Sequence, residues 1–328
     1  MSNTYKPVRL MLAIASILMI IPWMPLNPYI HHVTILILLF AYLATAWNML
    51  GGYAGQVSLG HAAFFGLGAY FTYFFLKWFN ITPLVGMFMA SAVSVAAAAA
   101  IGVVAFRFGL RGVYFVLATL AFAEILRELF IAFREITGGS LGVSYPVIGY
   151  SPLYFQFPER WPYYYFILSL WIITILTMYI LRGFFTKLVA IRENEEVAAS
   201  IGIDVPRYKL IALLLSSFFT SLGGAFYLQY YRYIDPNTVF GLELSIDIAV
   251  MAIFGGMYSI WGPSIGALIL VPTSEILRIT LGGGYYGAYL IIYGMLLILI
   301  LKLMPRGIYD KLYKIIYERT KVKKEIVR

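Results

Sequence analysis

Residues 31–60 read HHVTILILLFAYLATAWNMLGGYAGQVSLG, an apolar run of 20 residues followed by a glycine-rich break. A helix of 20 residues spans the roughly 30 Å hydrocarbon core of a bilayer. Similar runs recur along the chain of 328 residues, of which 62% are hydrophobic and only 12% are charged. A soluble protein of this size has about a quarter of its residues charged. The sequence therefore predicts an all-α integral membrane protein.

The apolar runs predict about ten transmembrane helices, at residues 10–30, 31–50, 60–79, 82–105, 112–133, 162–181, 208–231, 244–260, 261–277 and 285–304. With the N-terminus inside, 18 Lys and Arg fall in the inner connections and 5 in the outer ones. This bias predicts that both termini are cytoplasmic. The chain then divides into a transmembrane domain (residues 1–304) and a basic cytoplasmic tail (residues 305–328). The first run could also be a signal peptide, but no small-x-small cleavage site follows it.

Composition also limits the function classes. The net charge of +9 could indicate nucleic-acid binding, but the basic residues lie between the apolar spans, so we expect no nucleic-acid partner. There is no cysteine, and the three histidines (His31, His32 and His61) lack metal-ligand spacing, so we expect no metal site. A membrane-embedded enzyme would need a nucleophile and base or a motif such as His-Glu-x-x-His, and the sequence contains neither. We therefore expect a protein that is not an enzyme.

Two glycine-rich segments, residues 51–61 and 255–263, interrupt the apolar sequence at corresponding places in the two parts of the chain. Irregular backbone at membrane depth is tolerated only where protein buries it or where it lines a polar cavity. Such a pair indicates the substrate site of a transporter, although two tight turns at the inner surface are the alternative. The predicted substrate-pathway residues are Gly55, Gln56, Ser58, Gly60, His61, Phe64, Phe254, Gly255 and Gly256.

The long inner connection, residues 182–209, predicts a short capped helix. Asn194 is a favourable N-cap, and Gly202 suits the left-handed position after the last turn. A helix of two turns is not stable alone in water. Val197 and Ile201, four residues apart, would give it a small apolar face that needs a partner. A docking handle for another protein is one interpretation, and a helix that lies on its own bundle or on lipid headgroups is the other.

Residues 190–203 (AIRENEEVAASIGI) resemble the coupling loop of ABC importer permeases. Together with residues 52–64 (GYAGQVSLGHAAF), 111–115 (RGVYF), 137–139 (TGG) and 254–256 (FGG), they resemble the branched-chain amino-acid permeases over most of residues 40–275. The expected ATPase-coupling residues are Arg192, Glu193, Asn194, Glu195, Glu196, Ala198, Ala199 and Gly202.

The resemblance implies a multi-pass subunit of the cell membrane that works with several partners. They are a homologous sister permease, two cytoplasmic ATPases that hold ATP and Mg²⁺, and an extracytoplasmic solute-binding protein. The chain itself lacks a Gly-x-x-x-x-Gly-Lys-Ser/Thr phosphate loop, so ATP is expected to be hydrolysed by another chain, and no cofactor is expected on this one. Members of the family also carry urea or short amides, which leaves a second substrate class open. An ion-coupled secondary transporter is a further alternative, but no ionisable residue stands isolated at mid-membrane.

Charged residues also occur within the predicted spans, near their outer ends. Three of them share one helix at spacings of three and four residues, which allows contact. Charges in a span cost a few kcal/mol each and normally face partners or water. We expect a shared outer network that either braces the bundle or closes a gate, formed by Glu124, Arg127, Glu128, Asp247 and Glu275.

Overall fold

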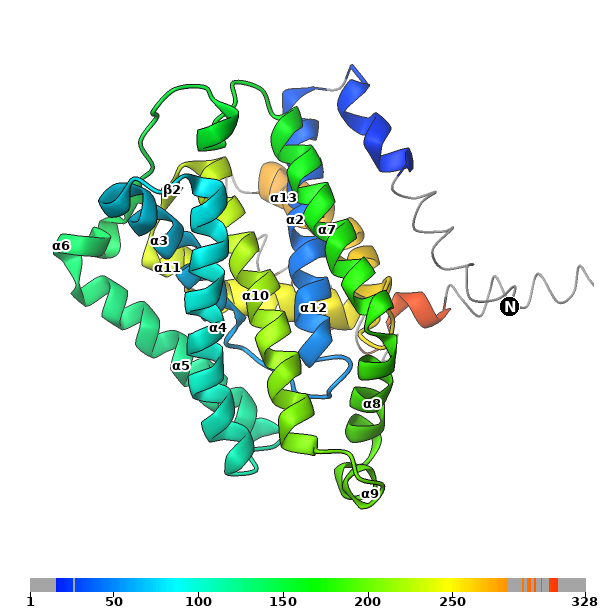
Figure 1. Ribbon diagram of the computed structural model, residues 1–328. Coiled ribbons are helices and arrows are strands. Elements are labelled where there is room, and N and C mark those ends of the chain that lie inside the picture. Colours follow the sequence, from blue (N-terminus) through cyan, green and yellow to red (C-terminus); the bar gives the residue numbers. More distant parts are fainter. Residues whose placement is uncertain are drawn as a thin grey trace, which may run out of the picture.

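The computed structural model describes residues 16–25 and 27–281, together with residues 291, 294, 295, 298, 302 and 307–311. This part of the chain is mostly helical (Figure 1). The predicted helix over 285–304 lies largely outside the described residues, as do most of the predicted tail from residue 305 and the start of the predicted helix over 10–30.

The eight longest helices of the described part are α2 (Pro28–Leu50), α3 (His61–Phe79), α4 (Pro83–Arg107), α5 (Val113–Ala132), α7 (Trp161–Ile180), α10 (Val205–Tyr231), α12 (Leu242–Gly255) and α13 (Gly262–Leu281). The shorter helices are η1 (Ile21–Trp23), α6 (Arg134–Thr137), η2 (Gly139–Leu141), η3 (Pro152–Tyr154), α8 (Arg182–Glu193), α9 (Glu195–Ser200) and α11 (Pro236–Val239). Two short strands, β1 (Val143–Ser144) and β2 (Tyr233–Ile234), pair antiparallel.

Five helical segments of the described part are long and apolar enough to cross a membrane. They are α2, α4, α7, α10 and the segment Pro236–Gly255, which joins α11 and α12. α5 has the length of a span but carries three charged residues within it. The chain is thus a helical, multi-pass membrane protein.

The centre of the bundle is α10, which packs against α2, α3 and α4. Small residues recur every four positions along it and are buried: Ala212, Ser216, Thr220 and Gly224. A Cβ added to Gly224 would overlap the carbonyl of Phe65 on α3, so the two backbones approach closely. Inside lipid, where burying apolar surface gives no drive to associate, such close contacts hold helices together.

The first predicted helix is wrong at its C-terminal end. Residues 16–20 are helical and η1 follows, but the chain then leaves the helix and α2 begins at Pro28. Prolines lack the N–H that a helix interior needs, whereas a proline at the first helical position loses nothing. Asn27 completes the new start, because its Oδ1 accepts a hydrogen bond from the N–H of Tyr29 at 3.0 Å.

Two connections that the sequence predicts to be inner also differ in detail from the prediction. α12 ends at Gly255 rather than at residue 260, because Gly256 adopts φ +121°, which a helix cannot accommodate. The connection over 182–209 contains a helix of 12 residues, α8, before the predicted short helix α9. We call residues 51–60 the first break and residues 256–261 the second break.

The bundle has two distinct ends. One end carries α9, at the bottom of Figure 1, together with both breaks, and we call it the coupling end after the predicted coupling residues. The opposite end, which the sequence predicts to be the outer one, carries α6, α11 and the pair β1–β2, and we call it the outer end. There, the guanidinium of Arg160 donates to the carbonyl of Pro28, and the N–H of Tyr145 donates to the carbonyl of Arg232 at 2.8 Å.

Candidate functional site: coupling loop, breaks and outer cluster

α9 has the capped geometry that the sequence predicts. The side-chain oxygen of Asn194 accepts hydrogen bonds from the N–H groups of Glu196 at 3.0 Å and Val197 at 3.1 Å. At the other end Gly202 has φ +87°. The N–H of Ile203 reaches the carbonyl of Ala198 at 3.1 Å, and the N–H of Gly202 reaches that of Ala199 at 3.0 Å. These two bonds form a Schellman motif, which satisfies the last carbonyls of the helix.

One face of α9 packs on the bundle and the other is uncovered. Ala198 is buried, whereas the side chains of Val197 and Ile201 are 58% and 70% exposed. Glu193 and Glu196 are exposed beside them. The small apolar face of α9 is therefore largely uncovered by the bundle.

Glu195, in contrast, points inward and pairs with two cations. Its carboxylate forms an ion pair with the Nζ of Lys209 on α10 and lies 3.1 Å from the Nε of Arg111 in the α4–α5 connection. Only 4% of the Lys209 side chain is exposed, so this pair is shielded from water. Glu195 thus fastens α9 to two other parts of the bundle and is not a free surface charge.

Arg192, the penultimate residue of α8, joins the coupling loop to both breaks. Its Nη1 donates to the carbonyl of Gly52 in the first break at 3.0 Å. Its guanidinium carbon lies 4.4 Å from the ring centroid of Tyr258 in the second break. Gly55, with φ +67°, lets the arginine stem pack against the backbone. Burial also raises the pKa of the neighbouring Tyr53 hydroxyl, so that it stays neutral beside the cation.

The two breaks lie directly against each other. The Nδ2 of Asn48, at the end of α2, donates to the carbonyl of Ser259 at 2.9 Å. A Cβ on Gly52 would overlap the carbonyl oxygen of Met257. At Gly255 a side chain would overlap the backbone of Gly262 at the start of α13. Glycines are needed here because two backbones meet without space for a side chain.

The second half of the first break returns into the bundle and is buried. The indole Nε1 of Trp47 donates to the carbonyl of Ser58 at 2.8 Å, and Ser58 Oγ accepts from the N–H of Gly60 at 3.2 Å. His61 Nε2 lies 2.7 Å from Ser216 Oγ on α10. Gln56 is 5% exposed.

This region also holds polar atoms that lack partners. Gln56 Oε1, Asn48 Oδ1 and His61 Nδ1 are buried without a hydrogen bond within the described residues. Phe64 and Phe254 are buried close by in sequence, each 1% exposed. A buried polar atom without a partner costs about 1–3 kcal/mol, so these three sites are natural places for a water molecule or a polar ligand.

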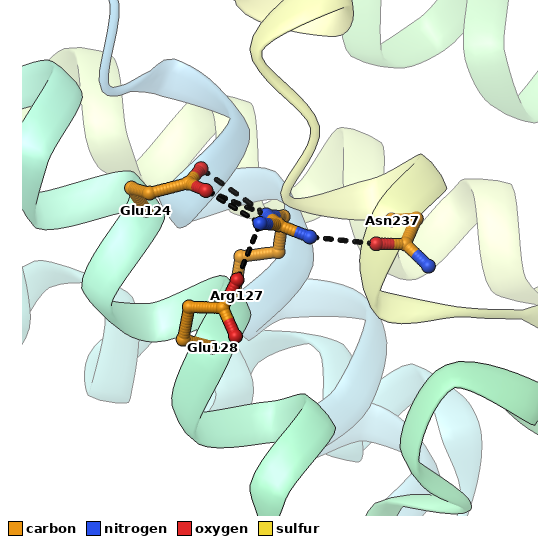
Figure 2. A network of polar contacts seen from close by, with 4 residues as sticks. All are labelled: Glu124, Arg127, Glu128 and Asn237. Carbon is orange, nitrogen blue, oxygen red and sulfur yellow. Dashed lines mark hydrogen bonds and ion pairs between the residues drawn. The ribbon is translucent and has the colours of Figure 1, made fainter.

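The predicted outer network separates into two groups. In the first, the Nη2 of Arg127 contacts Glu124 and Glu128 at 2.5 Å each, and its Nη1 donates to the Oδ1 of Asn237 on α11 at 2.7 Å (Figure 2). In the second, Glu275 on α13 accepts from Arg278 at 2.7 Å and from the hydroxyl of Tyr29 at 2.8 Å.

One cavity lies between these groups, and Asn237, Asp247 and Glu275 all line it. Within the described residues no ion pair connects Arg127 to either Asp247 or Glu275.

The model of the family described as "Branched-chain amino acid transport system / permease component" matches residues 29–301. The chain belongs to this family. It is similar to the high-affinity branched-chain amino acid transport system permease protein LivM of Salmonella typhimurium, with 24% identity over 93% of this chain and 76% of that protein. The LivM protein of Escherichia coli is also 24% identical, over 83% of this chain and 68% of that protein. No solved structure matches the chain.

The sequence prediction missed four residues that contact the breaks, the coupling loop or the outer cluster. Asn48 is a single amide at the end of an apolar run, and Lys209 a single cation near the start of another. A single polar residue in an apolar run could have indicated a functional position in both cases, because polar groups in spans normally face partners. Asn237 and Tyr258 carry no such signal, since they lie in connections where polar residues are ordinary.

Proposed function

We propose that this chain is the membrane-spanning permease subunit of an ATP-driven importer for branched-chain amino acids. Membership of the permease family and the similarity to two LivM proteins support this function. In this proposal the chain crosses the cell membrane ten times with both termini in the cytoplasm. It forms the translocation pathway together with a homologous sister permease and receives its substrate from an extracytoplasmic solute-binding protein.

The observation that carries the proposal is the contact of Arg192 with both breaks. In the proposed mechanism two cytoplasmic ATPases, which bind ATP and Mg²⁺, dock on the exposed face of α9 around Val197 and Ile201. A displacement of α9 then moves α8, and Arg192 passes the movement to the backbone of both breaks. Glu195 passes it to α10 and to the α4–α5 connection through its two ion pairs.

The breaks form the inner part of the pathway in this mechanism. Their glycines keep side chains out of the contact between the two backbones, so a small movement separates them. The partner-free polar atoms of Gln56 and His61 would provide hydrogen bonds to a passing solute. No formal charge of the breaks faces the solute, which suits a pathway that must release its cargo.

The test is uptake by the complete transporter in proteoliposomes, with sister permease, ATPases and binding protein. We expect uptake of leucine, isoleucine and valine that requires ATP on the cytoplasmic face and persists when ionophores collapse the ion gradients. Uptake of urea or acetamide instead would replace the substrate class, and dependence on an ion gradient would refute the importer.

The pathway residues are tested in the same assay. Gln56→Ala and Ser58→Ala should change turnover, whereas Ser169→Ala, at an exposed serine of α7, serves as the matched control. Normal turnover in both pathway variants would show that the first break does not line the pathway.

A further inference from the structure

A cavity of about 480 Å³ lies between α2, α3, α10, α11, α12 and α13. Its volume is in the range of about 300–1,000 Å³ that small-molecule sites have. Two of its wall residues, Leu36 and Leu39, lie 8 and 11 positions after the start of α2 at Pro28. At 1.5 Å per residue they are roughly 12–17 Å from that outer helix end. The cavity therefore reaches about half-way into a bilayer core of about 30 Å.

The described lining residues give the cavity a negative charge. Glu243 and Asp247, one turn apart on α12, and Glu275 on α13 all line it, and none of the described lining residues is Lys, Arg or His. Glu275 is already paired with Arg278, but neither Glu243 nor Asp247 forms an ion pair within the described residues. Two like charges at this spacing repel each other, and carboxylates in a span normally face a partner. A bound cation would relieve both costs.

The remaining walls suit the other two parts of an amino acid. Leu36, Leu39 and Phe65 give an apolar surface that a branched aliphatic side chain would contact. Asn237 provides a donor for a carboxylate. Arginine can only donate, so the atom of Asn237 that faces Arg127 is its oxygen. Its side-chain nitrogen points away from Arg127 (Figure 2) and keeps its two N–H donors for another acceptor.

We propose that this cavity is a membrane-embedded binding site for the transported amino acid, with the ammonium group held by Asp247 and Glu243. The aliphatic side chain lies against the leucines of α2, and the carboxylate accepts from Asn237. Arg127 acts as a positioning residue, because it orients the amide of Asn237 without lining the cavity. This inference rests on the proposed function for the identity of the ligand, while the site itself demands a primary ammonium group on an apolar body.

Leucine and two analogues that each lack one of its charged groups separate the parts of the ligand. Binding is measured on the complete transporter in phosphatidylcholine nanodiscs, without binding protein and without ATP. Leucine carries all three groups, 3-methylbutylamine lacks the carboxylate, and 4-methylpentanoate lacks the ammonium. We expect leucine and the amine to bind and the acid not to bind. Binding of the acid without binding of the amine would overturn the proposal.

Variants then locate the binding. Asp247→Asn should lower the affinity for leucine and the amine at least about tenfold, the scale of a lost charge-assisted hydrogen bond. Asp247→Glu should restore much of it. Glu135→Gln, at an exposed carboxylate of α6, is the matched control and should bind normally. Asp247→Asn removes an unpaired charge, so its melting temperature should not fall. Unchanged affinity in a folded Asp247→Asn protein would overturn the site.

Two further outcomes distinguish the site from its occupant and from the transport function. An aminophospholipid headgroup has the same ammonium chemistry, so the measurement is repeated with phosphatidylethanolamine in the nanodisc. If this lipid competes with the amine, the cavity is a lipid-binding site, and the proposal that it binds the transported amino acid is overturned. A transporter that moves urea, yet binds the amine through Asp247, would refute the proposed substrate while supporting the site. Leucine transport and leucine binding that are both unchanged in the Asp247 variants would support the proposed substrate and refute the site.

Discussion

The end of α9 offers a clean test of coupling, because Gly202 is a glycine for a conformational reason alone. It has φ +87°, and a Cβ built there meets no atom within 4 Å. A valine at this position therefore introduces backbone strain without a clash. For a residue with a Cβ the left-handed conformation costs roughly 1–2 kcal/mol, which lowers the population of the capped end about 5–30-fold. The strain falls on the two Schellman bonds from Gly202 and Ile203.

We expect Gly202→Val to insert into the membrane with a nearly unchanged melting temperature, because no buried contact of the bundle is lost. Substrate-stimulated ATP hydrolysis and uptake by the reconstituted complex should both be abolished. The matched control is Gly183→Ala in α8, where a Cβ also meets nothing, φ is ordinary, and alanine favours a helix by up to about 1 kcal/mol. Normal stimulated hydrolysis and uptake in Gly202→Val would show that the ATPases do not bind the end of α9. Equal loss in the control would show an unspecific effect.

Three other variants test neighbouring contacts. Arg192→Lys should reduce uptake several-fold while ATP hydrolysis continues, since an ammonium cannot hold a carbonyl and an aromatic ring in the arginine geometry; unimpaired uptake would exclude the proposed link. Glu195→Gln should lower the melting temperature by several degrees, because it leaves buried Lys209 without its carboxylate at a cost of up to about 3 kcal/mol. The exposed Glu196→Gln is its control, and equal melting temperatures would contradict the bracing role. Arg127→Met should lower the melting temperature if the outer cluster is a brace, whereas an unchanged melting temperature with lost transport would indicate a gate.

The features that the sequence predicts correctly are those that neighbouring residues decide. The cap at Asn194 and the left-handed Gly202 are within one short segment, and the structure confirms both. The ends of α4 and α7 lie within two residues of their predicted positions, since apolar length and proline set them. The prediction missed α8, although Phe185, Leu188 and Ile191 form a buried stripe at helical spacing. Its charged residues give α8 the composition that is typical of a loop between membrane spans.

The direction of a side chain within a predicted site is much harder to read from sequence. Glu195 and Glu196 are adjacent, identical and both in the first turn of α9, yet Glu195 is half-buried in an ion pair and Glu196 is exposed. The difference comes from Lys209 on α10 and Arg111 in the α4–α5 connection, which both approach Glu195 from other parts of the bundle. Nothing local to α9 distinguishes the two carboxylates.

What the sequence alone determines is the membrane class, most helix ends and the places where the helix must stop. These follow from the thickness of the bilayer, from the missing N–H of proline and from the φ that glycine permits. Only the tertiary structure places Arg192 against Gly52, 140 positions earlier in the chain, and forms a cavity between six helices. Such contacts depend on how helices pack, and in lipid that packing is set by small residues and polar contacts whose partners lie far apart in the sequence.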